Sequence, residues 1–134
     1  MTLATSIQTM SKPLRVSEAI INISNLRLRT FIGFNPEEKS KQQDVIINLE
    51  IRYCADSAFS SDMEEDALNY KIITKRMIHY VESGRFQLLE KLAADLLTIA
   101  SESERVNFAE IRVDKPHALR FADSVSVTLN ASRL

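Results

Sequence analysis

Cysteine, glycine, proline and tryptophan are scarce in this chain of 134 residues, which holds one, two, three and none of them respectively. The single Cys54 excludes an intrachain disulfide and a structural zinc site built from several thiolates. Because Gly33 and Gly84 are the only glycines, the chain has no glycine-rich phosphate loop. Its two histidines, His79 and His117, stand far apart, and no metal-ligand spacing links them to Cys54. We therefore expect no metal site.

Charge of one sign is also lacking, since 17 Lys and Arg residues balance 18 Asp and Glu residues and leave a net charge of −1. Without a basic field, no nucleic-acid partner is expected. No apolar run approaches the ~20 residues of a transmembrane helix, so no membrane partner is expected. The opening residues do not have the pattern of a secretory signal, and the expected location is the cytoplasm. We interpret residues 1–16 as a flexible tail and residues 17–134 as one domain.

Two segments in the first half alternate apolar and polar residues with the period of a β-strand. Residues 43–53 place an apolar side chain at every second position from Val45 to Tyr53. Residues 19–32 alternate in the same way, but the phase shifts by one residue near Asn25, which indicates a β-bulge. The polar residues 33–42 connect the two strands as a loop, and this arrangement predicts an antiparallel hairpin.

The second half contains two helical patterns followed by two strand patterns. Residues 70–82 and 87–103 repeat apolar residues at helical spacing, and Ser83-Gly84 ends the first helix. The stretches around Ile111–Val113 and Val125–Leu129 alternate as strands. The order β-β-α-α-β-β predicts an α+β domain with a four-stranded antiparallel sheet and two helices on one face. Such a sheet has two edge strands that favour pairing between copies, so a homo-oligomer is expected.

Polar residues gather where the predicted elements end, but each has an ordinary structural explanation. Glu90, in the first turn of the second helix, would face the positive end of the helix dipole, a placement worth roughly 0.3–1 kcal/mol. Lys115 would be an exposed strand-end lysine, Tyr70 a core aromatic and Glu38 one more loop charge. Taken singly, these residues do not indicate a site.

Taken together, four short motifs resemble the dihydroneopterin aldolase family in order and spacing, and the match runs from about residue 20 to residue 129. The motifs are Gly33 followed by Glu38 and Gln43, the pair Asn69-Tyr70, Leu88-Leu89-Glu90, and Val113-Asp114-Lys115-Pro116. The resemblance implies the tunnelling fold, in which four subunits form a ring, two rings stack into an octamer, and active sites lie between neighbouring subunits. It also implies chemistry without a metal or cofactor, because a carbon–nitrogen double bond of the dihydropterin ring accepts electrons when the adjacent carbon–carbon bond breaks.

The resemblance also implies a role for each matching residue. Glu90 would bind the amino-pyrimidine edge of a pterin, where a carboxylate accepts two N–H donors. Lys115 would be the general acid and base, with Glu38 and a Tyr70 from the adjacent subunit completing the proton network through water. The remaining predicted contacts, of which the two leucines would flank the flat ring, are Leu68, Asn69 and Leu89.

Three further stretches, residues 25–33, 66–70 and 117–126, resemble the branch of the family that epimerises dihydroneopterin triphosphate. In that branch, cleavage and re-formation of a carbon–carbon bond invert side-chain carbon 2′ and give 7,8-dihydromonapterin triphosphate, an intermediate toward tetrahydromonapterin. A triphosphate needs cations, and arginine suits bidentate phosphate contact. The candidate cations are Arg27, Arg29, His117 and Arg120. Arg27 and Arg29 would equally well be alternate residues on a solvated strand face.

Two other functions stay open at this point. Aldolase activity would use the same Glu38, Tyr70, Glu90 and Lys115, but would release 6-hydroxymethyl-7,8-dihydropterin and glycolaldehyde. A non-catalytic pterin- or purine-binding oligomer on the same fold would keep Glu90 and lose Lys115 and Tyr70. The presence of both residues argues against this last alternative.

Overall fold

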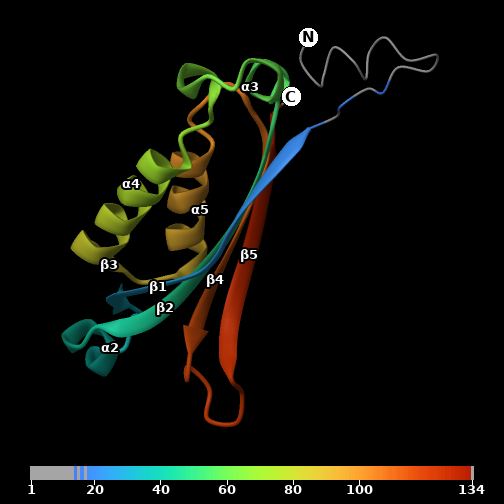
Figure 1. The fold of residues 1–134 in the computed structure, drawn as a ribbon. Coiled ribbons are helices and arrows are strands. Elements are labelled where there is room, and N and C mark those ends of the chain that lie inside the picture. Colours follow the sequence, from blue (N-terminus) through green and yellow to red (C-terminus); the bar gives the residue numbers. More distant parts are fainter. Residues whose placement is uncertain (1–13, 15, 17, 134) are drawn as a thin grey trace.

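The computed structural model describes residue 14, residue 16 and residues 18–133, and Figure 1 shows how they are arranged. The predicted tail lies almost entirely outside these residues, so its flexibility and the domain boundary at residue 17 stay predictions. In chain order the elements are β1 Ala19–Ile32, α2 Pro36–Ser40, β2 Gln43–Tyr53, α3 Asp56–Ser61, the 3₁₀ helix η1 Glu64–Asp66, α4 Tyr70–Ser83, β3 Arg85–Phe86, α5 Leu89–Ala100, β4 Val106–Pro116 and β5 Ser124–Ser132.

The strands form one curved sheet in the order β3-β1-β2-β4-β5, with α4 and α5 packed on one of its faces (Figure 1). The four long strands pair antiparallel, as predicted, and the α+β fold is confirmed. The predicted count of four strands is wrong, because β3 adds a fifth strand that runs parallel to the end of β1. With two residues, β3 is too short to show any periodicity in the sequence.

The predicted bulge is present in β1. The register with β2 shifts between Ile23 and Leu26, and Asn25 has a left-handed backbone with φ of 55°. The N–H of Asn25 donates to the side-chain oxygen of Asn48 on β2 at 2.9 Å, which satisfies a donor that the bulge removes from the ladder. Because of the extra residue, Ile23 before the bulge and Leu28 after it both contact the core beneath the helices.

The core lies between the sheet and the two long helices. The buried stripe of α4 includes Met77 and Val81, and α5 buries five residues over its length. Each fully buried aliphatic side chain of this kind contributes roughly 1.5–3 kcal/mol. Thr30 is the buried polar residue that connects the layers: its hydroxyl donates to the carbonyl of Val81 at 2.6 Å and contacts that of Gly84 at 3.2 Å. This contact fixes the end of α4 on β1 and thereby places β3 beside it.

Short helices occupy residues 33–42, which we predicted as a polar loop, and also residues 56–69. In residues 33–42, Asn35 caps α2 by accepting a hydrogen bond from the N–H of Glu38 at 2.8 Å, and Pro36 begins the helix. In residues 56–69, α3 and η1 form separate turns. The helix predicted over residues 87–103 is shorter at both ends than expected.

Both outer edges of the sheet are largely open in the described chain. β3 pairs with β1 at Phe31 and Ile32, and the rest of the outer edge of β1 has no neighbouring strand among the described residues. On the opposite side, β5 has β4 as its single neighbour within the same residues. None of the described helices has the length and apolarity required to cross a bilayer.

Candidate functional site

Glu38 and Lys115, 77 residues apart in the sequence, form an ion pair at the end of the molecule where β3 lies in Figure 1. The ammonium group of Lys115 donates to Oε2 of Glu38, and the two side chains are 12% and 21% exposed. The alternative of an exposed strand-end lysine is therefore wrong for Lys115. A part-buried lysine with a carboxylate partner beside open surface has the composition of a proton-transfer site.

Three neighbouring residues hold the carboxyl group of Glu38. Gly33 has φ of +128°, and a Cβ atom at this position would overlap that carboxyl group. The side-chain amide of Gln43 donates to the carbonyl of Ile32 at 2.7 Å and contacts Oε2 of Glu38 at 3.5 Å. The hydrogen bond from Lys115 keeps the pKa of Glu38 below its ordinary value despite partial burial, with Gln43 adding to this effect.

Asp114, directly before Lys115, fixes the end of β4. Its carboxylate accepts hydrogen bonds from Arg112 at 2.8 Å and from the hydroxyl of Ser124 on β5 at 2.6 Å. Burial acts to raise the pKa of Asp114, but the bonds from Ser124 and Arg112 outweigh it, and the pKa lies below its ordinary value. The charged Asp114 thus joins β4 to β5 and limits the positions that Lys115 can adopt.

Glu90 and Leu89, the predicted pterin contacts on α5, lie at the same end of the molecule as the pair of Glu38 and Lys115. α5 begins beside β3, so its first turn opens toward this end of the sheet (Figure 1). Glu90 is exposed in that first turn, and Leu89 packs partly against the core. The position leaves the carboxylate of Glu90 free to accept donors from a ligand.

The predicted contacts around α4 lie elsewhere in the same chain. Leu68 is 6% exposed and belongs to the core, and Asn69 caps α4 by accepting from the N–H of Ile72 at 3.2 Å. Tyr70 is 50% exposed, so the alternative of a core aromatic is wrong. α4 spans 14 residues, roughly 20 Å, and Tyr70 is at the end away from β3. The chain therefore does not bring its own Tyr70 to Lys115.

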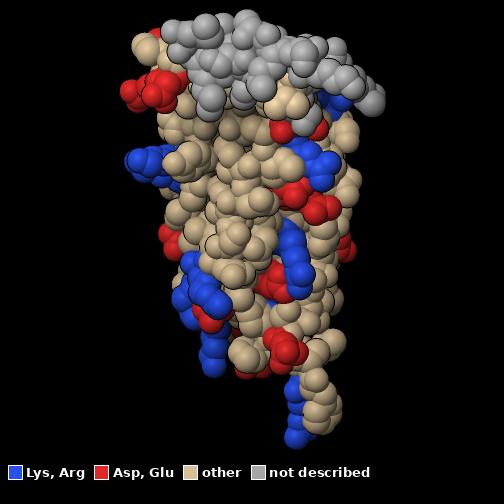
Figure 2. All heavy atoms as spheres, turned by 45° about the vertical axis from the view of Figure 1, so that its right-hand side comes forward, with Lys and Arg blue, Asp and Glu red and all other residues tan. Residues whose placement is uncertain are grey.

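The predicted phosphate contacts are all exposed and fall into two groups. Arg27 and Arg29 lie on the exposed face of β1, where Arg29 pairs with Asp44 at 2.7 Å. His117 and Arg120 lie in the loop between β4 and β5, a narrow projection at the bottom of Figure 2. His117 begins this loop with a left-handed backbone, and the guanidinium group of Arg120 lies 5.5 Å from the ring centre of Phe121.

A hollow of about 230 Å³ adjoins the carboxylate of Glu38. The short helix α2 contributes Lys39 to its wall, and the segment at β3 contributes Arg85 and Gln87. Sequence reasoning missed all three residues, because β3 and α2 were not predicted. Asn35-Pro36 was a readable helix-start signal, whereas nothing in the sequence indicated β3.

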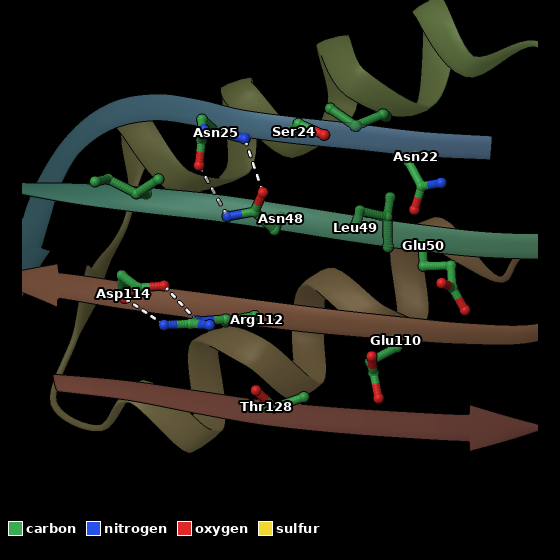
Figure 3. Close-up of a pocket in the computed structure, with 12 residues that line it drawn as sticks. Asn22, Ser24, Asn25, Asn48, Leu49, Glu50, Glu110, Arg112, Asp114 and Thr128 are labelled. Carbon is green, nitrogen blue, oxygen red and sulfur yellow. Dashed lines mark hydrogen bonds and ion pairs between the residues drawn. The ribbon is translucent and has the colours of Figure 1, made fainter. Parts of the chain in front are cut away.

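A larger hollow of about 560 Å³ lies on the face of the sheet opposite α4 and α5, and Figure 3 shows its polar lining. Asn25 and Asn48 hydrogen-bond across β1 and β2, Glu50 and Glu110 face each other across β2 and β4, and Arg112 reaches Asp114. None of the predicted site residues lines this hollow. Nowhere in the described chain do three His, Cys, Asp or Glu residues gather as metal ligands.

Curated proteins similar to this chain include dihydroneopterin triphosphate 2′-epimerases and dihydroneopterin aldolases. Dihydroneopterin triphosphate 2′-epimerase of Escherichia coli K12 is 56% identical over 115 residues, which cover 86% of this chain and 96% of that protein. The protein of the same name from Pseudomonas aeruginosa PAO1 is 51% identical over 115 residues, 86% of this chain and 94% of that one. Dihydroneopterin aldolase of Escherichia coli K12 is 27% identical over 110 residues, 82% of this chain and 90% of that one.

The fold and a family profile agree with these relatives. The crystal structure of Escherichia coli dihydroneopterin aldolase in complex with neopterin matches with a TM-score of 0.80 at 26% identity, over 85% of this chain and 99% of that chain. The profile of the dihydroneopterin aldolase family, FolB, matches residues 21–130. Sequence, fold and the pair of Glu38 and Lys115 lead to one conclusion: the chain belongs to the dihydroneopterin aldolase family.

Proposed function

We propose that this protein is an isomerase that converts 7,8-dihydroneopterin triphosphate to 7,8-dihydromonapterin triphosphate by inverting side-chain carbon 2′. Relatives named for this epimerase activity are 51% and 56% identical over nearly their whole length, whereas the relative named as an aldolase is 27% identical. The observation that carries the proposal within the structure is the part-buried ion pair of Lys115 and Glu38.

The reaction needs a group that takes and returns one proton. The ammonium group of Lys115, which is ion-paired with Glu38 in the structure, first releases a proton. The resulting amine accepts the proton of the 2′-hydroxyl, and the bond between carbons 1′ and 2′ breaks as the oxygen forms an aldehyde. The electron pair of that bond moves into the carbon–nitrogen double bond of the ring. The aldehyde then presents its other face, the bond re-forms, and Lys115 returns the proton to the oxygen. Glu38 holds the amine in place throughout.

Ring binding is the proposed task of Glu90. Its exposed carboxylate at the start of α5 accepts two N–H donors from the amino-pyrimidine edge, with Leu89 against the ring. Leu68 and Asn69 precede Tyr70 at the start of α4 and would approach the ring from a neighbouring subunit together with Tyr70. Because the side chain of Leu68 lies in the core, its contact would be made by the backbone. In this arrangement the chemistry proceeds without a metal or a bound cofactor, because the dihydropterin ring is its own electron acceptor.

Aldolase activity is the second candidate function, since the same residues serve it. The two outcomes differ in the fate of the intermediate: protonation at carbon 1′ releases the aldehyde, whereas re-addition gives the epimer. A phosphate tail held by the protein keeps the aldehyde fragment beside carbon 1′ and favours re-addition. A non-catalytic binding role is disfavoured by the paired Lys115.

We also propose a ring-forming homo-oligomer, with the octamer of two stacked tetramers as the expected form. The open edges of β1 and β5 support this assembly, because four long antiparallel strands leave β1 and β5 running in opposite directions. When β5 of one copy adds to β1 of the next, the antiparallel pattern continues, and repetition closes a ring. Such a ring supplies the Tyr70 that the chain cannot bring to its own Lys115.

The free, exposed Cys54 suits the proposed cytoplasmic location.

Incubation of the purified protein with dihydroneopterin triphosphate, and separately with dihydroneopterin, tests the function. Chromatography that resolves the epimers and detects glycolaldehyde identifies the products. The proposal expects the 2′-epimer of the triphosphate as the main product. Faster release of glycolaldehyde from unphosphorylated dihydroneopterin would establish the aldolase instead. Sedimentation equilibrium measures the number of subunits, and a monomer would contradict the shared site.

A further inference from the structure

We propose that Arg85, assisted by Lys39, holds the phosphate chain of the substrate in the hollow beside Glu38; this inference rests on the proposed function. Arg85 and Lys39 line the hollow of about 230 Å³ together with the carboxylate of Glu38, which holds Lys115. A pterin side chain whose carbon 2′ lies at Lys115 carries its phosphates one carbon further along, so a phosphate site must adjoin the reacting atoms.

Arg85 is oriented before any ligand binds. Its guanidinium group lies 3.8 Å from the ring centre of Phe31, and one nitrogen, Nη1, donates to the carbonyl of Lys39 at 3.0 Å. A guanidinium group has five N–H donors in a rigid plane, so the remaining donors are available to phosphate oxygens. Stacking on Phe31 reduces the freedom that the side chain would lose on binding.

The charge around Arg85 favours an anion. Within residues 18–133, no carboxylate lies close enough to Arg85 or Lys39 to form an ion pair. Glu38 is the acidic residue on the lining, and Lys115 already pairs with it. The hollow is therefore lined by two cations without an ion-pair partner among the described residues and by one carboxylate that Lys115 neutralises, which suits a highly charged phosphate chain.

The cations predicted from sequence fit this role less well. The guanidinium group of Arg29 already donates hydrogen bonds to the carboxylate of Asp44 at 2.7 Å and to the carbonyl of Gln42 at 2.9 Å. Arg120 lies on the projecting loop between β4 and β5, against Phe121, which is 96% exposed. Arg29 and Arg120 are absent from the lining of the hollow beside Glu38.

The short strand β3 positions Arg85 for this role. Its two residues pair with β1 so that Arg85 lies directly opposite Phe31, and Gly33 donates to the carbonyl of Phe86 at 2.9 Å. In a loop without strand pairing, the backbone of Arg85 would have no fixed position. The short parallel strand holds Arg85 close to Gly33, which contacts the carboxyl group of Glu38.

The test compares kcat/KM for dihydroneopterin triphosphate and for dihydroneopterin in the wild type, Arg85→Ala, Arg85→Lys and a control, Arg76→Ala. Arg76 is an exposed arginine of α4 that pairs with Glu102, so its loss removes the same charge far from the hollow. For Arg85→Ala we expect a loss of about ten- to hundredfold on the triphosphate and little change on dihydroneopterin. The loss in Arg85→Lys should be smaller than in Arg85→Ala but still measurable, because an ammonium group keeps the charge and lacks the planar, bidentate donors of a guanidinium group.

Inhibition by inorganic tripolyphosphate gives a second readout that does not depend on turnover of the triphosphate. Tripolyphosphate should inhibit conversion of dihydroneopterin by the wild type. For the same degree of inhibition, Arg85→Ala should require a tripolyphosphate concentration at least about ten times higher. Equal losses on both substrates would assign Arg85 a structural role and overturn the inference, as would unchanged activity on the triphosphate. A wild type that forms no epimer would instead overturn the proposed function.

Discussion

Substitution of Gly33 by alanine should damage the site more than its small size suggests. The backbone at Gly33 has φ of +128°, a conformation that costs a residue with a side chain about 1–3 kcal/mol. The new methyl group would also overlap the carboxyl group of Glu38, which must move and lose its hydrogen bond from Lys115. A hydrogen bond to a charged group is worth about 1.5–3 kcal/mol. Together the two effects predict a loss of about 2.5–6 kcal/mol in the free energy of unfolding.

Urea denaturation measures this loss, and turnover is measured at a temperature where the variant stays folded. Because Glu38 no longer holds Lys115, kcat should fall at least about tenfold in the folded variant. Gly84→Ala is the matched control: its φ is −102°, and its methyl group would lie 2.5 Å from the ring of Phe86 and not near Glu38. Gly84→Ala should lose stability but keep the kcat for dihydroneopterin, because the pair of Glu38 and Lys115 is untouched and this substrate has no phosphate chain. If Gly33→Ala retains wild-type stability and kcat, the proposed support of Glu38 by Gly33 is refuted.

Three further predictions concern single groups. Lys115→Ala should lower kcat while pterin binding measured by fluorescence persists, and Glu90→Ala should mainly abolish binding; wild-type turnover in Lys115→Ala would contradict the mechanism. The pKa of Glu38 is lower in the folded state than in the unfolded state, so its ionised carboxylate stabilises the fold above about pH 4.3. This contribution disappears as the pH falls through the folded-state pKa. Glu38→Gln should therefore weaken the dependence of the free energy of unfolding on pH in the acid range. Thr30→Val should reduce the free energy of unfolding by about 1–3 kcal/mol, because the buried carbonyl of Val81 loses its short hydrogen bond from the hydroxyl and keeps only the longer one from the N–H of Gly84. A neutral result in urea denaturation would contradict this role for the hydroxyl.

Periodicity predicted the long elements well. β1 and β2 have the predicted bounds, because alternate burial over many residues leaves a clear pattern, and the phase shift at Asn25 marked a real bulge. Two-residue β3 was beyond this method, since pairing at Phe31 and Ile32 depends on where α4 ends and on the buried hydroxyl of Thr30. These are contacts between distant segments, which leave no local signal.

The candidate site was predictable in its residues but not in its geometry. Glu38 and Lys115 were selected through the family resemblance, and each had an ordinary explanation when taken alone. Their contact depends on the pairing of β2 with β4, which brings residues far apart in sequence to one end of the sheet. Arg85 was missed because an arginine beside a helix end is unremarkable until stacking on Phe31 shows its orientation.

The bulge in β1 makes one exposed position intolerant of changes in chain length. Before Asn25 the odd-numbered Ile21 and Ile23 contact the core, and after it the even-numbered positions do. Deletion of one residue there would exchange the two faces of the following segment, turning Phe31 toward the helices and Thr30 away from them. The support beneath Arg85 and the hydroxyl that anchors α4 would be lost together. Substitutions at this surface can accumulate during evolution, but insertions and deletions of a single residue should be eliminated by selection.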